Sequence, residues 1–482
     1  MGQEQSGVRK NLFWMGGTAF AGQIITWSIT IWVARLLLPS DYGLVALAGV
    51  FTVFAQMVCE MGVGTAVIQV DEISKDQYET LYAYSLLLGV AMFIIGFLIG
   101  APLMAYFYDE PKLQWLIRYS SLVFIISAAR SMPRNILARN VRFEVIAKVE
   151  ASSRILTSFC VLAMALQGFG VWALASQWLL IELFQFLGFI VNQPVRPSIS
   201  KKFGETKYIL YFGIKIVLRN IVYQFYNLCD GAIIGKIGSQ SFLGAYSFAK
   251  QLTNMPFEKI IRIVNQVLLP YLSKDKKDLA RLRQWTVDTV EMQMVVIVPF
   301  YLFVFFCAEE IVMILLGSNW EEAIIPLQFL SIAHIFKLAE SYNSNLLTAL
   351  GRITIQIKYM ATQFLIISSG IILLSILFNI ESSLYVWVLF YPIITIAFTR
   401  ISLQSIDLRI IKILKKTHRI VIVQGLLVAF LLLVSCLSND MLSVWHSLII
   451  KGTSGIIFYV SVFYLLDKKN LRRIFSSFRG KI

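Results

Sequence analysis

Charged residues are scarce in this sequence. Asp, Glu, Lys and Arg make up 15% of the 482 residues, whereas 57% are hydrophobic. A soluble protein of this length needs far more polar surface, so the composition indicates a polytopic membrane protein. Acidic residues are the scarcer kind, with 28 against 43 basic residues and a net charge of +15. The basic residues lie in short loops between apolar stretches, which excludes nucleic acid as a partner.

Cysteine and histidine are also rare, with five and three residues. No two cysteines are close in sequence, so neither a disulfide nor a metal site is predicted. His334, His418 and His446 lack the spaced partners that a metal site needs. The paired acids Glu309/Glu310 and Glu321/Glu322 favour solvated loop charge over a catalytic pair. We therefore expect a protein that is not an enzyme and has no metal or cofactor, with H⁺ or Na⁺ coupling left open.

Long apolar stretches make up most of the sequence. They predict an all-α polytopic membrane protein with about 14 transmembrane helices. The expected spans are 12–37, 44–70, 79–106, 113–136, 145–167, 170–192, 208–237, 242–270, 285–307, 323–349, 354–379, 383–403, 419–437 and 444–466.

Basic residues cluster in alternate loops between these spans. One side holds Arg130, Arg134, Arg139 and Arg142, with similar groups at 196–207, 274–283 and 409–419 and at both ends of the chain. The opposite loops are mostly acidic. Because loops rich in Lys and Arg stay inside, we expect both termini to be cytoplasmic.

The two halves of the sequence resemble each other. A shift of 201 residues sets Gln23 on Gln224, Ser40 on Ser241 and Gly43 on Gly244. We therefore expect two six-helix lobes, 1–200 and 201–404, followed by two additional helices and a basic tail in 405–482. Since six spans separate the copies, the lobes are related by a pseudo-two-fold axis along the membrane normal, with the site between them.

Several spans carry charge that is expensive in a bilayer unless it faces a polar cavity or an opposite charge. Lys215, Arg219 and Asp230 share one face of span 208–237. They form either an internal salt bridge that fixes packing or the wall of an aqueous pathway. Further cations at membrane depth are Arg118, Lys250 and Lys337, whereas Arg154 and Arg262 lie near cytoplasmic span ends. A cavity lined by these groups suits an anionic ligand, phosphate above all.

Further polar residues accompany these cations. Glu340 and His334 lie on the same helix face as Lys337. In the first half, Gln56 and Glu60 share a face, and Gln23 lies on the first helix. These side chains suit either sugar hydroxyls or structural hydrogen bonds between helices, and the sequence does not separate the two.

Two segments resemble a known family. WVARLLLPSDYGLVALAGVFTVFAQ, in the first half, and NLCDGAIIGKIGSQSFLGAYSFA at 227–249 are similar to the Wzx-type polysaccharide transporters. These form a branch of the multidrug/oligosaccharidyl-lipid/polysaccharide (MOP) superfamily, which also holds the MATE transporters. The resemblance covers essentially the whole chain.

The resemblance implies a flippase of the bacterial inner (cytoplasmic) membrane. Its substrate would be an undecaprenyl-pyrophosphate-linked oligosaccharide, carried from the cytoplasmic to the outer leaflet by alternating access for lipopolysaccharide or exopolysaccharide synthesis. The family's cationic cavity would map onto Lys215, Arg219, Lys250 and Lys337, and Asp230, Glu60 and Glu340 would be titrating candidates for ion coupling. Implied partners are membrane lipids, a polysaccharide polymerase and chain-length proteins. The rivals are a lipid II flippase, an ion-coupled multidrug antiporter and a membrane glycan polymerase or ligase.

Overall fold

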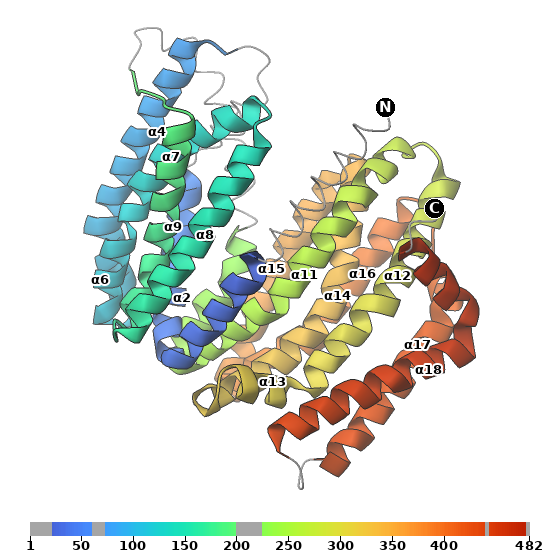
Figure 1. The fold of residues 1–482 in the computed structure, drawn as a ribbon. Helices are drawn as coiled ribbons and strands as arrows, with labels where there is room; N and C mark the ends of the chain where they lie inside the picture. Colours follow the sequence, from blue (N-terminus) through green and yellow to red (C-terminus); the bar gives the residue numbers. More distant parts are fainter. Residues whose placement is uncertain (1–21, 60–72, 199–223, 439–442, 479–482) are drawn as a thin grey trace, which may run out of the picture. The chain divides into compact units, whose positions relative to one another are not determined.

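The computed structural model describes residues 22–59, 73–198, 224–438 and 443–478, and every regular element in these ranges is a helix (Figure 1). Nine of the described helices are long and apolar enough to cross a membrane. A further pair, Gly22–Leu36 and Pro39–Gln56, passes the same test together but bends by 116°. The expected all-α polytopic membrane fold is confirmed.

The described helices do not by themselves reach the expected fourteen spans. Two expected spans, at 113–136 and 242–270, correspond to helices that are not among the nine. The first is α6 (Pro111–Ser120) followed by α7 (Leu122–Arg139), and the second is α11 (Gln240–Lys274). Arg130 and Lys250 lie inside α7 and α11 and lower their hydropathy. The count of fourteen stays a prediction.

The chain divides into two compact units, Met1–Gly244 and Ala245–Ile482. We call them unit 1 and unit 2. The expected lobe boundary at 200 falls in 199–223, outside the described residues, and stays a prediction. Helix 224–237 and the start of α11 belong to unit 1.

Unit 1 is built around α7. Its described helices are 22–36, α2 (Pro39–Cys59), α4 (Lys75–Ile95), the π-helical turn η1 (Gly96–Gly100), α5 (Ala101–Tyr108), α6, α7, α8 (Phe143–Leu166), α9 (Val171–Asn192) and 224–237. α4 and α9 both pack against α7. A Cβ atom at Gly89 of α4 would lie 2.7 Å from the Cβ of Ala128, so the α4 and α7 backbones approach as closely as they do only because Gly89 lacks one.

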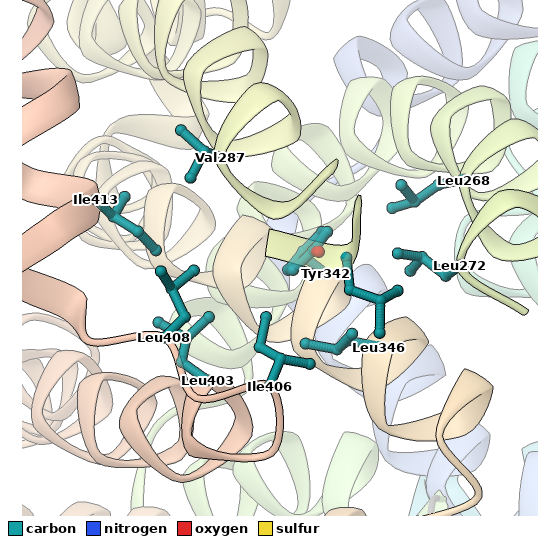
Figure 2. Packing of buried hydrophobic residues seen from close by; sticks show 10 residues of the cluster. Leu268, Leu272, Val287, Tyr342, Leu346, Leu403, Ile406, Leu408 and Ile413 are labelled. Carbon is teal, nitrogen blue, oxygen red and sulfur yellow. The ribbon is translucent and has the colours of Figure 1, made fainter. Parts of the chain in front are cut away.

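Unit 2 is built around α14 (Ile324–Ala349). Its other helices are the remainder of α11, α12 (Leu279–Phe306), α13 (Ala308–Leu315), η3 (Ser318–Ala323), α15 (Ile353–Leu377), η4 (Glu381–Tyr385), α16 (Val386–Gln404), α17 (Ile410–Ser438) and α18 (Val444–Phe478). α14 packs between α12 and α16. Tyr342 and Leu346 of α14 join Leu272, Leu282 and Leu403 in one buried apolar cluster (Figure 2). With Ile413 of α17, this cluster ties five helices of unit 2 together.

The two C-terminal helices, α17 and α18, pack on α12 and α13. Lys451 of α18 donates to Glu310 of α13 at 2.5 Å, and both side chains are at most 5% exposed. Gln424 of α17 donates to the Met294 carbonyl at 2.6 Å, and Tyr459 of α18 donates to the Val295 carbonyl at 2.8 Å. These polar contacts fix the pair to the rest of unit 2.

Two glycines mark a reciprocal contact in unit 1. A Cβ atom at Gly43 would lie 2.0 Å from the Gln240 carbonyl oxygen, and one at Gly244 would lie 1.7 Å from the Pro39 carbonyl oxygen. Shifting Pro39 and Gly43 by 201 residues gives Gln240 and Gly244. The first turns of α2 and α11, which the sequence repeat pairs, therefore pack on each other through exchanged contacts.

We predict that Gly244→Ala destabilises unit 1 because the obstructing atom is a backbone carbonyl, which cannot rotate away as a side chain could. Overpacking of this kind costs about 1–3 kcal/mol. The matched control is Gly231→Ala, where a new Cβ meets nothing within 4 Å. Thermal unfolding of the purified variants in detergent measures both. Equal stability of the two variants would contradict the tight turn contact.

Candidate functional site

A basic group lies between α11 and α14 in unit 2. Lys250 and Asn254 are four residues apart on α11, and His334 and Lys337 are three apart on α14, so each pair shares a helix face. The Lys337 ammonium donates to Asn254 Oδ1 at 2.9 Å, and His334 Nε2 lies 3.0 Å from the same oxygen. Lys250 is close enough to His334 to act on its charge. We call these four residues the basic site.

Aromatic rings hold the basic site in place. The Lys337 ammonium lies 5.3 Å from the centre of the Phe257 ring, a cation–π contact. Tyr301 of α12 stacks on the His334 imidazole at 5.2 Å, and its hydroxyl donates to the Thr253 carbonyl at 2.9 Å. The imidazole is only 3% exposed. These contacts fix the His334 ring and steady the Lys337 side chain before any ligand arrives.

A second polar cluster lies on the same helix. Glu340 of α14 accepts a hydrogen bond of 2.6 Å from the Tyr391 hydroxyl of α16. Tyr359 and Gln363 of α15 lie beside the same carboxyl group. Glu340 is therefore a buried acid that accepts a hydrogen bond from a neutral hydroxyl. Such an acid can exchange a proton without breaking an ion pair.

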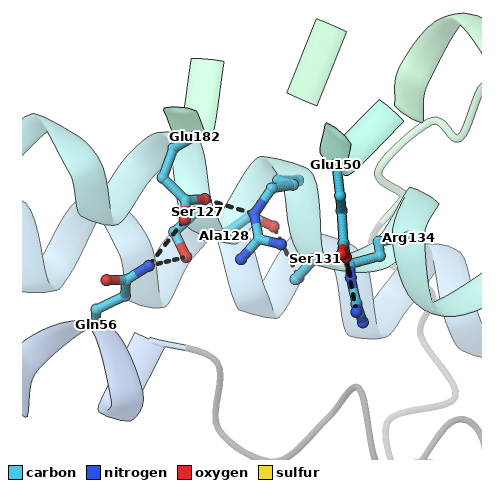
Figure 3. Close-up of polar contacts among 8 residues, drawn as sticks. Gln56, Ser127, Ala128, Ser131, Arg134, Glu150 and Glu182 are labelled. Atoms are coloured by element: carbon cyan, nitrogen blue, oxygen red, sulfur yellow. Dashed lines mark hydrogen bonds and ion pairs between the residues drawn. The ribbon is translucent and has the colours of Figure 1, made fainter. Parts of the chain in front are cut away.

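Unit 1 contains a buried ion pair that the sequence reasoning missed. Arg130 of α7 donates to Glu182 of α9 at 2.5 Å, with both side chains about one-tenth exposed. Gln56 of α2 donates to the other oxygen of Glu182 at 3.0 Å, and Figure 3 shows Gln56 and Ser127 beside that carboxylate. Gln56 thus makes a hydrogen bond between helices, one of its two expected roles. The signal for this pair was an acid within the apolar span 170–192.

The same contacts correct the assignment of Arg130 and Arg134 to a loop. Both lie in α7, and Arg134 donates to Glu150 of α8 at 3.0 Å (Figure 3). They can lie within a helix because acids on neighbouring helices neutralise them.

We predict different stabilities for the two pairs because their burial differs. Arg130→Met leaves Glu182 with Gln56 as its donor but without its cation, and should cost about 2–3 kcal/mol. Arg134→Met is the matched control, since the Arg134 and Glu150 side chains are 36% and 27% exposed. It should cost less than about 1 kcal/mol. Thermal unfolding ranks the variants, and a larger loss from Arg134→Met would overturn the ranking.

The remaining predicted site residues have separate surroundings. Arg118 of α6 donates to the Phe97 carbonyl at 3.4 Å, and its guanidinium lies 5.0 Å from the Phe97 ring and 4.9 Å from the Trp115 ring. Asp230 is 2% exposed and accepts from the Gly231 amide at 2.8 Å. Gln23 donates to Thr26 at 3.4 Å on its own helix. Lys215, Arg219 and Glu60 lie outside the described residues.

Of the predicted cationic cavity, the structure thus brings Lys250 and Lys337 to one site. Asn254 was missed, because the sequence reasoning followed the charged residues of this span and the amide is neutral. His334 had been placed on the Lys337 face and proves to contact Asn254 as well.

Comparison with known sequences identifies relatives. A profile of the family described as "Polysaccharide biosynthesis protein" matches residues 32–325. The chain is 26% identical over 303 residues to the teichuronic acid biosynthesis protein TuaB of Bacillus subtilis (strain 168), a match that covers 62% of each chain. It is 24% identical over 344 residues to the lipopolysaccharide biosynthesis protein WzxC of Escherichia coli (strain K12), covering 68% of this chain and 67% of WzxC.

Comparison with solved structures identifies the fold. The lipid II flippase MurJ, in an inward closed conformation, superposes with a TM-score of 0.73 over 95% of this chain and 100% of its own, at 14% identity. An inward-facing MATE family multidrug resistance transporter gives a TM-score of 0.62 over 80% of this chain and 94% of its own, also at 14% identity. At this identity the likeness concerns the fold alone.

The family profile covers more than half of the chain, and the structural match covers nearly all of it. The chain therefore belongs to the polysaccharide biosynthesis protein family, and it is a multi-pass membrane protein with the fold shared by MurJ and the MATE proteins.

Proposed function

We propose that this protein is a flippase that carries an undecaprenyl-pyrophosphate-linked oligosaccharide from the cytoplasmic to the outer leaflet of the bacterial inner membrane. The observation that carries the proposal is the basic site, where Lys337 and His334 contact the Asn254 amide oxygen and Lys250 lies near His334. Positive charge held in a membrane span suits an anionic ligand, and the pyrophosphate is the anionic part of such a substrate.

The physical problem of the reaction is the head group. A pyrophosphate bearing several sugars cannot cross hydrocarbon unaided, whereas the apolar polyprenyl tail dissolves in the hydrocarbon core of the bilayer. The basic site offers the pyrophosphate a polar environment at membrane depth while the tail stays in the lipid. Polar side chains of the spans, Gln23 among them, suit the sugars. Lys215, Arg219 and Arg118 complete the proposed cationic path.

Alternating access requires two lobes that rock about the site. We propose that these are the lobes at 1–200 and 201–404, related by a pseudo-two-fold axis, within a topology of fourteen spans that keeps both termini cytoplasmic. The reciprocal contact of Pro39–Gly43 with Gln240–Gly244 supports this symmetry. Rocking of the lobes must either keep this contact or break it. The first turns of α2 and α11 therefore form either a pivot that stays closed or a gate that opens.

Coupling to an ion gradient would give the transport its direction. Glu340, Asp230 and Glu60 are the proposed titrating groups. The surroundings of Glu340 favour it, because Tyr391 can hydrogen-bond either protonation state of the carboxyl group. A polysaccharide polymerase and chain-length proteins would take the product on the outer face.

Two transporters of the same fold are the rivals. A lipid II flippase would also bind a polyprenyl pyrophosphate, and a multidrug antiporter would favour an acidic site for cationic drugs. The basic site argues against the antiporter. Two relatives are named for the biosynthesis of teichuronic acid and of lipopolysaccharide, and these names favour polysaccharide precursors over lipid II as the substrate.

Complementation separates these functions. The chain should restore surface polysaccharide in a strain lacking its own polysaccharide flippase, and should neither sustain growth of a strain depleted of its lipid II flippase nor raise drug resistance. Growth of the depleted strain without restored polysaccharide would replace the proposal with the lipid II function.

A further inference from the structure

The first turns of α17 carry three cations on one exposed face. Lys412, Lys415 and Arg419 are exposed, and at 100° per residue they lie within about 60° of one another around the helix. Within the part of the chain that the structure describes, neither lysine ammonium forms a hydrogen bond or an ion pair. The Arg419 guanidinium donates to the Leu466 carbonyl at 3.5 Å, a long contact with a neutral group. We call these three residues the cationic face.

A fourth cation of the same turns is neutralised by the protein itself. Lys416 lies 3.7 Å from Asp288 and 3.7 Å from Glu291, and both acids belong to α12. Among the described residues, no acid is supplied in this way to the cationic face. Three neighbouring cations without an acid repel one another and attract an anion from outside the chain.

An exposed apolar surface continues from the cationic face along α17. Ile422, Leu426 and Leu433 follow Lys415 at spacings that keep them on its side of the helix, and they are 51%, 42% and 59% exposed. Because α17 is long and apolar enough to cross a membrane, this surface contacts acyl chains. Leu414, among the cations, is 47% exposed, as suits a segment at the boundary between head groups and acyl chains.

We propose that this face of α17 binds an anionic phospholipid of the surrounding bilayer. The phosphate lies on Lys412, Lys415 and Arg419, and an acyl chain lies along the apolar surface below them. The charge selects an anionic head group over a zwitterionic one, since each Lys or Arg near a membrane surface strengthens binding of anionic lipid about fivefold. Because Lys416 ties the same turns to α12, the bound lipid holds both helices at a fixed depth in the bilayer. The face lies on a different helix from the basic site, so this inference goes beyond the proposed function.

Native mass spectrometry of the delipidated full chain in detergent tests the cations. The probes are dioleoyl phosphatidylglycerol and dioleoyl phosphatidylcholine, which share their acyl chains and differ in head-group charge. The variant is Lys412→Gln/Lys415→Gln. The matched control is Lys276→Gln/Lys277→Gln, which removes two exposed lysines from the turn between α11 and α12. A third variant, Lys412→Arg/Lys415→Arg, keeps the charge.

We expect the wild-type chain to bind its first phosphatidylglycerol at least about tenfold more tightly than its first phosphatidylcholine. Lys412→Gln/Lys415→Gln should weaken binding of phosphatidylglycerol about 10- to 30-fold, whereas the control and the arginine variant should stay within about twofold of the wild type. Equal losses in the two glutamine variants, or no loss in either, overturn the proposal.

A second measurement locates the lipid with every lysine in place, so it decides the matter even if the glutamine variant misfolds. Leu414 is replaced by the photoreactive amino acid benzoylphenylalanine, and the comparison position is Ile376 of α15, an apolar residue that is 72% exposed. In nanodiscs with equal parts of the two lipids, position 414 should capture phosphatidylglycerol about fivefold over phosphatidylcholine, and position 376 should capture both equally. Capture without preference at position 414 overturns the proposal. Capture of a polyprenyl phosphate instead of a glycerophospholipid in native membranes also overturns it, and assigns the face to the transported lipid.

Discussion

Lys337→Ala should reduce export of surface polysaccharide by about 10- to 100-fold in a complemented strain. The ammonium forms a charge-assisted hydrogen bond with Asn254 beside His334, and it is the cation of the basic site that the structure fixes most firmly. Interactions of this class contribute about 1.5–3 kcal/mol, which corresponds to that loss in affinity. The assay scores surface polysaccharide at matched expression.

The control for this variant is Lys276→Ala. Lys276 is an exposed lysine between α11 and α12, so its removal changes the net charge equally without touching the basic site. Export by Lys276→Ala should equal that of the wild type. If Lys337→Ala exports normally as well, the basic site does not bind the pyrophosphate, and Lys215 and Arg219 become the next cations to substitute.

Lys451→Met should produce the largest loss of stability. Lys451 and Glu310 form an ion pair whose side chains are 4% and 5% exposed, and Ser447 donates to the same carboxylate oxygen at 2.5 Å. Removing one partner of such a pair leaves a buried charge and costs about 3–5 kcal/mol. We expect a lower thermal unfolding temperature in detergent and faster proteolysis of α17 and α18.

The double variant Glu310→Gln/Lys451→Met separates charge from packing. Since it buries no uncompensated charge, it should recover much of the stability that Lys451→Met loses. If the double variant is as unstable as the single one, the two side chains act through packing and the electrostatic account is wrong.

The membrane fold could be predicted from the sequence because hydrophobic length reports bilayer crossing directly. The repeat was visible in a few residues. In the structure Gly43 packs against Gln240, and Gly244 packs against Pro39. Lys250 and Lys337 could be singled out one at a time because each interrupts an apolar span. A charged residue within an apolar span can be recognised from its sequence neighbours alone, so its identification needs no structure.

Pairing between distant residues could not be predicted in this way. Asn254 and Lys337 are 83 residues apart, and Arg130 and Glu182 are 52 apart. Arg130 was read as a loop residue because its neutralising acid lies on another helix and leaves no trace near it in the sequence.

The central claim is tested most directly by translocation in proteoliposomes containing only this protein. The substrate is a fluorescent polyprenyl-pyrophosphate oligosaccharide, and the comparison is the same sugar on a neutral polyprenyl carrier without phosphate. We predict that the protein moves the pyrophosphate-linked sugar between leaflets faster than empty liposomes do, and that it does not accelerate the neutral carrier. Equal rates for both lipids, or no acceleration of either, would contradict a flippase that recognises its substrate through the pyrophosphate.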